Sequence, residues 1–203
     1  MDFHKLSSYR GLIFDLDGTL IDSMPFHVKA WCQVAKEHGF EIDPNDIYRI
    51  AGSASIDIAE HYKKQGRPVG DSSEYVQRKM AIYRSHVDEI RIFEKIFDTL
   101  KKCRQSGAKI AIGTGSSRDN ALEVLNRKGI LDYVDVVITS SDVKAHKPNP
   151  DTFLAAADKM GLSPRECCVF EDGGLGLVAA VNGGFDCIEV SDNDMIRLYE
   201  IQR

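Results

Sequence analysis

Short apolar runs alternate with amphipathic stretches along most of the chain, and this alternation constrains the fold more than any other feature. Five such runs have the length and composition of buried strands. They are residues 11–14 (GLIF), 109–113 (KIAIG), 134–139 (VDVVIT), 167–171 (CCVFE) and 186–190 (DCIEV). Nearly continuous apolar strands that alternate with helices are typical of a parallel sheet covered on both faces. The sequence therefore predicts an α/β protein built around a parallel sheet.

One long interval interrupts the alternation. Between Ser23 and about Ile90 there is no convincing strand, whereas Pro25 fits a helix start and further helices fit 57–64 and 73–89. The apolar residues of the first of these helices share one face: Phe26, Ala30, Trp31, Val34 and Ala35. We therefore expect an α/β core made of residues 1–22 and 91–203, with a helical domain inserted at 23–90. Its hinges are expected near Ser23–Met24 and Ile90–Phe93.

Composition and charge exclude several classes of function. The net charge of −5 makes nucleic acid and anionic membranes poor partners. No apolar run approaches the length of a transmembrane helix, about 20 residues, and the first ten residues lack the apolar segment of a signal peptide. The five cysteines contain no C-x-x-C pair and are expected to be reduced. We expect a cytoplasmic protein that is a monomer or a weak dimer.

Polar residues follow four of the predicted strands. Ligands of open parallel sheets bind beyond the carboxyl ends of the strands, so these residues are expected to share one site. They are Asp15, Asp17, Gly18 and Thr19 after the first strand, Thr114, Gly115 and Ser116 after the second, Lys147 in the loop after the third, and Glu171 and Asp172 at the end of the fourth.

This set of side chains suits phosphoryl transfer. Asp15 and Asp17 lie one residue apart, and like charges this close raise each other's pKa unless a cation intervenes. Mg²⁺ prefers carboxylate oxygens together with substrate phosphate, and Asp15 and Asp172 can supply the carboxylates. The ion would keep Asp15 ionised and able to attack phosphorus, forming an acyl phosphate. Asp17 is placed to protonate the leaving oxygen and later to deprotonate water.

Phosphate-binding groups complete the predicted site. Thr114 and the amides around Gly115 can bind phosphate oxygens, and Lys147 can neutralise charge in the transition state. Pro148 biases Lys147 toward an extended conformation. Each of these features alone also fits a turn or a helix cap, but four of them occur in order, each after its own strand.

The motifs DLDGT (15–19), GTGS (113–116), Lys147-Pro148 and Glu171-Asp172 resemble, in this order, the four motifs of the haloacid dehalogenase superfamily. The resemblance covers about residues 11–190. It implies a Rossmann-like core and a Mg²⁺-dependent phosphotransferase, usually a phosphatase.

The resemblance also implies a role for each matching residue. Asp15 would be the nucleophile, and Asp17 the acid and base that also offers its carbonyl oxygen to Mg²⁺. Thr114 and Lys147 would hold phosphate. Asp172 would be a metal ligand, and Glu171 would reach the metal directly or through water. Substrate contacts are expected from Gly18, Thr19, Gly115 and Ser116.

Within this superfamily, HVKAW (27–31) is similar to a segment of the β-phosphoglucomutase-like branch, which carries a helical cap after the first strand. The resemblance implies that His27 and Lys79 approach the substrate from the cap. The ordinary alternatives are a hydrogen-bonded structural histidine and a lysine on a solvated helix face. For Trp31 we favour structural packing at the cap hinge.

Two departures from that branch affect the expected function. Ser55, in AGSAS (51–55), stands where the mutases carry an arginine that grips the distal phosphate of a bisphosphate. Its loss favours hydrolysis, and GTGSS, HKPNPDTF and the short cap resemble the bacterial fructose-1-phosphate phosphatases. Phosphoryl transfer between sugar hydroxyls, as in β-phosphoglucomutase, stays the alternative. Gly173 and Gly174 follow Glu171-Asp172, where Ser or Ala is usual, and this change is expected to loosen the turn beside the metal.

Two other classes of protein share some of these features. GLGLVA (174–179) fits a dinucleotide-binding fingerprint, but it lies near the end of the chain rather than in the first βα turn. A signalling receiver domain would also combine an acidic pocket with a threonine and a lysine. Its phospho-accepting aspartate follows a later strand, however, and it has no long helical insertion. We therefore expect a Mg²⁺-dependent phosphatase acting on a small sugar phosphate.

Overall fold

The computed structural model describes the backbone of residues 3–201. Its centre is a sheet with the strand order β3–β2–β1–β4–β5–β6. Neighbouring strands from β3 to β5 are parallel, whereas β6 pairs antiparallel with β5. The strands are β1 (Gly11–Phe14), β2 (Lys109–Gly113), β3 (Val136–Ile138), β4 (Cys167–Glu171), β5 (Asp186–Ser191) and β6 (Asp194–Tyr199).

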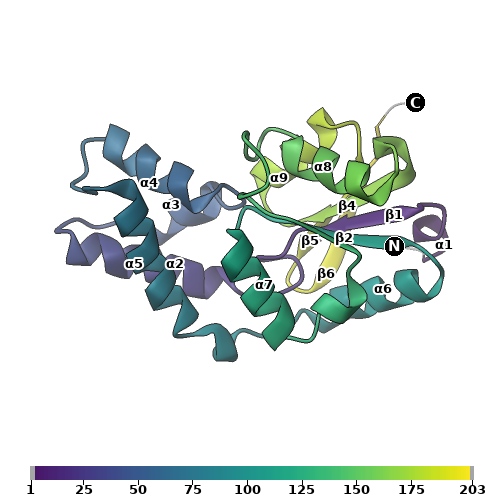
Figure 1. Ribbon diagram of the computed structural model, residues 1–203, viewed down its shortest axis with the longest axis horizontal. Coiled ribbons are helices and arrows are strands. Elements are labelled where there is room, and N and C mark those ends of the chain that lie inside the picture. The colour runs from purple at the N-terminus through teal and green to yellow at the C-terminus, as the bar shows by residue number, and fades with distance from the viewer. Residues whose placement is uncertain (1–2, 202–203) are drawn as a thin grey trace.

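Helices cover both faces of this sheet (Figure 1). The buried apolar side chains of α6 and α7 belong to one core cluster, and those of α8 and α9 belong to a second cluster on the other face. This three-layer arrangement confirms the predicted α/β fold. The helices are α1 (Phe3–Leu6), α6 (Glu94–Gln105), α7 (Arg118–Arg127), α8 (Asp151–Met160) and α9 (Gly174–Asn182), with short 3₁₀ turns at Leu131–Tyr133 and Pro164–Glu166.

The segment between β1 and α6 forms a separate group of helices beside the carboxyl edge of the sheet (Figure 1). We call this segment, residues 23–90, the helical insertion. Its elements are α2 (Met24–Glu37), α3 (Pro44–Arg49), α4 (Ser55–Lys64), α5 (Ser72–Arg84) and a 3₁₀ turn at Val87–Glu89. α5 packs against both α2 and α4. No strand is found in this interval of the described chain, in agreement with the prediction.

The two connections between the helical insertion and the sheet lie side by side. The Asp22 amide donates to the Arg91 carbonyl oxygen at 2.9 Å, and the Phe93 amide donates to the Leu20 carbonyl oxygen at 2.9 Å. Ile21 forms an isolated antiparallel bridge with Ile92. Paired crossings of this kind provide a compact place for a hinge, and the predicted division of the chain into two domains at these points stays a prediction.

Several elements differ from the sequence-based expectation. The strand β6 was not predicted, because it is a partly exposed edge strand with mixed polarity. It follows β5 through a tight turn in which Asp192 and Asn193 have positive φ values of 48° and 66°. The strand expected at 134–139 is limited to Val136–Ile138, and the helix expected at 73–89 ends at Arg84. The short helix α3 has too few residues to show a helical period.

Two smaller expectations concern membranes and cysteines. Within the described residues, no helix combines the length and the apolar character that crossing a membrane requires. None of the five cysteines forms a disulfide; Cys32 is partly exposed, and the other four are buried.

The N-terminus of α5 offers a test of the helical insertion. Asp71 accepts hydrogen bonds from the amides of Ser73 and Glu74, both at 2.9 Å. Asp71→Ala should therefore lower the free energy of unfolding by about 1 kcal/mol, whereas Asp71→Asn should retain the cap and most of the stability. Urea denaturation of the two variants measures the difference, and equal losses would contradict the capping role.

Candidate active site

A buried lysine joins two strand ends at the centre of the site. Asp15 follows β1, and Glu171 is the last residue of the neighbouring strand β4. Phe14 pairs with Phe170 in the parallel ladder, so the next residues, Asp15 and Glu171, lie side by side. The Lys147 ammonium donates to Asp15 Oδ1 and to Glu171 Oε1, both at 2.6 Å. All three side chains are almost fully shielded from solvent. The lysine therefore ties the loop after β3 to the two central strands.

Burial makes this arrangement electrostatically demanding. Burial raises the pKa of Asp15 well above its ordinary value, although Lys147 acts in the opposite direction. Burial and the negative charge of Glu171 raise the pKa of Asp172 to about 7. For Lys147, burial alone lowers the pKa, but Asp15 and Glu171 outweigh it and hold the pKa above the ordinary value. One ammonium thus faces three crowded carboxyl groups.

These carboxyl groups fit a divalent cation. Asp15, Glu171 and Asp172 each offer an oxygen, and these oxygens lie within 4.8 Å of one another. The Thr19 hydroxyl donates to Asp172 Oδ1 at 2.8 Å and fixes the orientation of that carboxylate. Hard cations prefer such oxygen donors, and a positive ion would relieve the crowding that raises the carboxyl pKa values. The residues present therefore suit a metal of the Mg²⁺ type.

Two glycines leave the space that these carboxylates occupy. A Cβ atom on Gly18, which has a φ of +90°, would lie 2.2 Å from Asp172 Oδ2. A Cβ atom on Gly176, in the first turn of α9, would lie 1.8 Å from Glu171 Oε1. The Gly173 amide also donates to Glu171 Oε2 at 2.8 Å. Gly173 and Gly176 therefore pack against the acidic cluster, so the second glycine of the pattern that resembled a dinucleotide fingerprint makes room for Glu171.

Asp17 lies outside the three-carboxylate cluster and has its own partners. Asp17 Oδ1 accepts hydrogen bonds from the Ser23 hydroxyl at 2.7 Å and from His27 Nε2 at 3.0 Å. Asp17 Oδ2 accepts from the Ser116 hydroxyl at 2.7 Å. Both carboxylate oxygens thus face the helical insertion and the loop after β2. The predicted contact of the Asp17 carbonyl oxygen with a metal stays a prediction.

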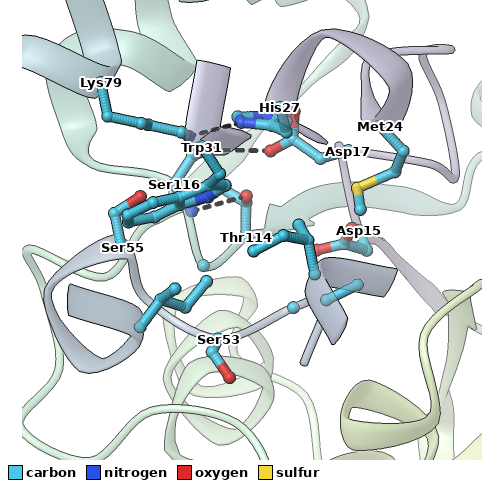
Figure 2. Close-up of a pocket in the computed structure, with 15 residues that line it drawn as sticks. Asp15, Asp17, Met24, His27, Trp31, Ser53, Ser55, Lys79, Thr114 and Ser116 are labelled. Carbon is cyan, nitrogen blue, oxygen red and sulfur yellow. Dashed lines mark hydrogen bonds and ion pairs between the residues drawn. The ribbon is translucent and has the colours of Figure 1, made fainter. Parts of the chain in front are cut away.

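His27 connects Asp17 to Lys79 (Figure 2). The distance from His27 Nδ1 to Lys79 Nζ is 2.7 Å, and the His27 ring stacks on Tyr83 with 4.0 Å between ring centroids. Lys79 Nζ lies 5.0 Å from the Trp31 ring centroid. Lys79 is 1% exposed and His27 is also buried. The alternative of a solvated lysine on a helix face is therefore wrong.

Burial and neighbouring groups set the protonation states of Asp17, His27 and Lys79. Burial alone would raise the pKa of Asp17, but His27 and the hydroxyl donors lower it below its ordinary value. Burial and the nearby Lys79 lower the pKa of His27. Burial lowers the pKa of Lys79 to about 7, although Asp17 acts in the opposite direction. A neutral His27 that donates from Nε2 to Asp17 can accept a hydrogen bond from Lys79 at Nδ1.

A cavity separates the two groups of residues, and several predicted site residues line it (Figure 2). Its volume is about 50 Å³, well below the roughly 300 Å³ at which small-molecule sites usually begin. A sugar phosphate would need the helical insertion to move. The lining residues are Asp15, Asp17, Met24, His27, Trp31, Ile47, Ala51, Gly52, Ser53, Ser55, Ile58, Lys79, Thr114, Gly115 and Ser116.

The loop after β2 forms the floor of this cavity. Thr114 is buried, and its hydroxyl oxygen accepts a hydrogen bond from the Ser116 amide at 3.0 Å. A Cβ atom on Gly115 would lie 2.4 Å from the Gly52 carbonyl oxygen, so only glycine lets the helical insertion come this close. By contrast, Gly18 and Thr19 contact Asp172 and are absent from the cavity lining. Their predicted contact with substrate stays a prediction.

Gly173 and Gly174, which stand where related proteins usually have Ser or Ala, differ in their surroundings. A Cβ atom on Gly173 would lie 3.2 Å from the Ala51 carbonyl oxygen, whereas a Cβ atom on Gly174 would meet nothing within 4 Å. Gly173 therefore accommodates the 51–54 loop of the helical insertion. The expected loosening beside the metal is not what the contacts favour, because the Gly173 amide is bonded to Glu171.

Some residues of the site were missed by the sequence reasoning. Ser23 lies four residues after the first motif, and Tyr83 lies one helical turn after Lys79 on the same face of α5. The sequence distance of Ser23 from the first motif and of Tyr83 from Lys79 could have indicated that both lie near the site. Met24, Ile47 and Ile58 form an apolar part of the cavity wall, and they could not be told from ordinary core residues.

An α/β core with a buried acidic site at the carboxyl edge of its sheet is typical of one class of hydrolases. The chain belongs to the haloacid dehalogenase-like hydrolase family, whose model matches residues 12–190. This match confirms the predicted family and the prediction of an enzyme.

Two curated relatives and one solved structure illustrate the similarity. Fructose-1-phosphate phosphatase YqaB of Escherichia coli is 35% identical over 182 residues, which are 90% of this chain and 96% of the relative. Hexitol phosphatase A of Escherichia coli is 31% identical over 194 residues, covering 95% and 88%. The crystal structure of β-phosphoglucomutase from Clostridium difficile superposes with a TM-score of 0.82 at 25% identity, covering 91% of this chain and 85% of the other.

The packing of Glu171 against α9 can be tested with two alanines in one helix. Gly176→Ala should displace the Glu171 carboxylate and lower the free energy of unfolding by about 2 kcal/mol, as overpacking does. Gly174→Ala should be neutral within about 0.5 kcal/mol, because its site is open. Urea denaturation provides the measurement, and a Gly176→Ala variant as stable as Gly174→Ala would refute this packing.

Buried Lys79 predicts a pH dependence of stability. Its folded-state pKa is about 7, whereas a lysine in an unfolded chain titrates near about 10.4. Between these values the unfolded state binds more protons, so this residue's contribution to stability rises with pH. The stability advantage of Lys79→Met over wild type should therefore be largest below about pH 7 and shrink toward about pH 10. Denaturation of both proteins at several pH values measures the gap; a constant gap would be incompatible with this assignment.

Proposed function

We propose that this protein is a Mg²⁺-dependent phosphatase that hydrolyses a small sugar phosphate through an aspartyl-phosphate on Asp15. The observation that supports this most directly is the buried Lys147 ammonium between Asp15 and Glu171, with Asp172 close by. Hexose phosphates, fructose-1-phosphate among them, are the first candidates, because the relatives include a fructose-1-phosphate phosphatase and a hexitol phosphatase.

In the first half-reaction, an Asp15 carboxylate oxygen would form a bond to phosphorus while the bond from phosphorus to the sugar oxygen breaks. Mg²⁺ held by Asp15, Asp172 and Glu171 would neutralise charge on the phosphoryl oxygens. Lys147 would add a second positive charge, and Thr114 and the Gly115 amide would bind phosphoryl oxygens.

Asp17 would carry the protons of both half-reactions. It would protonate the departing sugar oxygen and then take a proton from the water that attacks phosphorus, which breaks the bond to Asp15 and releases phosphate. In the arrangement described here Asp17 is a carboxylate with three hydrogen-bond donors, the state suited to the second step. For the first step it must gain a proton, which His27 would relay: Nε2, 3.0 Å away, would give its proton to Asp17 while Nδ1 takes one from the Lys79 ammonium, 2.7 Å away.

The cavity favours hydrolysis over mutase chemistry. Transfer between sugar hydroxyls passes through a bisphosphate, whose second phosphate needs a cation on the side of the helical insertion. Among the residues that line the cavity there, Lys79 is the only cationic one, and it is bonded to His27. Ser55 supplies only a hydroxyl. A β-phosphoglucomutase-type activity is therefore the second candidate and an outcome of the test.

We propose that residues 23–90 act as a mobile cap over the core formed by 1–22 and 91–203. The small cavity and the paired crossings at Ile21 and Ile92 support a cap that opens for substrate and closes for chemistry. Sequence-based expectations of a cytoplasmic location and of a monomer or weak dimer belong to the same proposal.

A phosphate-release screen tests the proposed activity. Hexose 1-phosphates, hexose 6-phosphates and hexitol phosphates are incubated with the full chain, with Mg²⁺ or with EDTA. The proposal expects catalytic phosphate release that requires Mg²⁺. Conversion of β-glucose 1-phosphate to glucose 6-phosphate without matching phosphate release would favour the mutase instead. A single labelling event without turnover would favour a receiver-like phospho-acceptor.

The nucleophile is tested by substitution of Asp15. Asp15→Asn should lower turnover by about 10³-fold or more, because an amide cannot form the acyl phosphate. Asp17→Asn should slow both half-reactions, and exposed Asp119→Asn serves as the control with wild-type turnover. Steady-state phosphate release with circular dichroism of each variant gives the result. Undiminished turnover in Asp15→Asn would exclude the nucleophile assignment.

A further inference from the structure

His146 contacts the helical insertion from the residue directly before Lys147. Its Nδ1 atom lies 2.7 Å from Asp57 Oδ2, and its Nε2 atom lies 3.2 Å from the Ser140 carbonyl oxygen. Asp57 belongs to the first turn of α4, whereas His146 belongs to the loop between β3 and α8. The pair therefore joins two parts of the chain that are separated by 89 residues in sequence.

Both ring nitrogens of His146 face hydrogen-bond acceptors. A carbonyl oxygen can only accept, and an ionised carboxylate can only accept. A neutral imidazole has one N–H group and satisfies one of these partners, whereas an imidazolium has two and satisfies both. The contacts with Asp57 and Ser140 are thus complete when His146 is protonated.

Several other charged groups lie near His146; Lys144, in the same loop, is exposed, and the others are engaged elsewhere. Lys147 follows it in sequence, but the ammonium turns to Asp15 and Glu171. On the 139–142 turn, Asp142 is bonded to Thr139 and paired with Arg118. On α4, Glu60 accepts a hydrogen bond from Ser72, and His61 contacts Gln65. Asp57 is therefore the charged partner that His146 contacts from the helical insertion.

The pair is one of several contacts in a seam between the helical insertion and the core, which includes the 51–54 loop. Along this seam the Gly52 carbonyl oxygen approaches Gly115, the Ala51 carbonyl oxygen approaches Gly173, and Gly52 lies close to the Lys147 side chain. Asp57 and His146 extend this row of contacts by an ion pair. The side chain of His146 is 16% exposed and that of Asp57 is 51% exposed, so the pair remains accessible to protons from solvent.

We propose that His146 and Asp57 form a latch that holds the helical insertion closed over the site when His146 is protonated. This inference rests on the proposed cap movement, but it concerns residues outside the proposed catalytic set. Loss of the imidazolium proton removes one of two hydrogen bonds and weakens closure. Closure is therefore favoured at a pH at which the His146 ring is protonated and is weakened at a higher pH at which the ring is neutral.

Trp31 gives a readout that needs no substrate. It is the single tryptophan of the chain, it is 1% exposed, and it lines the cavity that opening would expose. Acrylamide quenching of its fluorescence in the full-length protein should increase from about pH 6 to about pH 8. Asp57→Asn and His146→Gln should each shift the equilibrium toward the open form about fivefold at the lower pH, the upper range for a partly exposed pair. Because Asp57 is exposed, its variant keeps the test available if His146→Gln fails to fold.

Two further variants separate the latch from other causes. Lys79 Nζ lies 5.0 Å from the Trp31 ring centroid, and burial lowers the pKa of Lys79 to about 7, but this residue is unchanged in His146→Lys. That variant keeps a cation opposite Asp57 at all these pH values, so it should stay closed and lose the part of the pH response that His146 supplies. Glu123→Gln serves as the control. It breaks the ion pair between Glu123 of α7 and Arg84 of α5, whose charged atoms lie 3.4 Å apart and which does not line the cavity, and it should leave the pH response intact.

The outcomes decide the proposal. In a double-mutant cycle at about pH 6, Asp57→Asn combined with His146→Gln should be no more open than either single variant, since both break one contact. Additive opening, wild-type quenching in Asp57→Asn, or a full pH response in His146→Lys would each overturn the latch. Where phosphate release is found, the kcat/KM values of wild type and Asp57→Asn should differ most near pH 6 and converge near pH 8. Quenching needs no turnover, so a failed phosphatase screen and a failed latch give different results.

Discussion

The rest of the site depends on one buried interaction, the Lys147 ammonium placed between Asp15 and Glu171. Removing three charged side chains from water is costly, and only close opposite charge and good hydrogen bonds offset it. The parallel pairing of β1 with β4 sets the two carboxylates side by side, and the loop after β3 brings the lysine to them. With Asp172 included, negative charge remains in excess. The residues present therefore suit a divalent cation, which would offset this excess of negative charge.

The same interaction explains why small residues surround the cluster. Gly18 and Gly176 leave room for the carboxylates of Asp172 and Glu171, and the amide of Gly173 bonds to Glu171. A side chain at either of the first two positions would push an acidic group out of its place. Glycine is thus required here by the proximity of carboxylate oxygens to the backbone. The positive φ of Gly18 adds a second requirement at the tightest of these turns.

Much of this could be predicted because strand ends are a local property. Apolar runs located the parallel strands, and the rule that ligands bind at their carboxyl ends gathered Asp15, Thr114, Lys147 and Asp172 before any distance was known. What the sequence does not encode locally was missed. The edge strand β6 has no alternating pattern strong enough to stand out, and the contact of Asp57 with His146 joins residues far apart in the chain. The burial of Lys79 likewise depends on α2 and α5 packing face to face, which a helical period alone does not reveal.

If the helical insertion moves as proposed, the seam between it and the core would link these features to selectivity. The carbonyl oxygens of Ala51 and Gly52 face Gly173 and Gly115, so the contact is made by main chain against main chain, with little freedom to adjust. When such a seam closes, bulk water is excluded and the charges of Lys147 and the carboxylates act at lower effective dielectric. A substrate whose sugar part keeps the 51–54 loop away from these glycines would prevent closure. Water would then remain in the site and screen the charges of Lys147 and the carboxylates. Selectivity would then arise from whether closure is completed, and less from direct hydrogen bonds to the sugar, because much of the cavity wall on the side of the helical insertion is apolar.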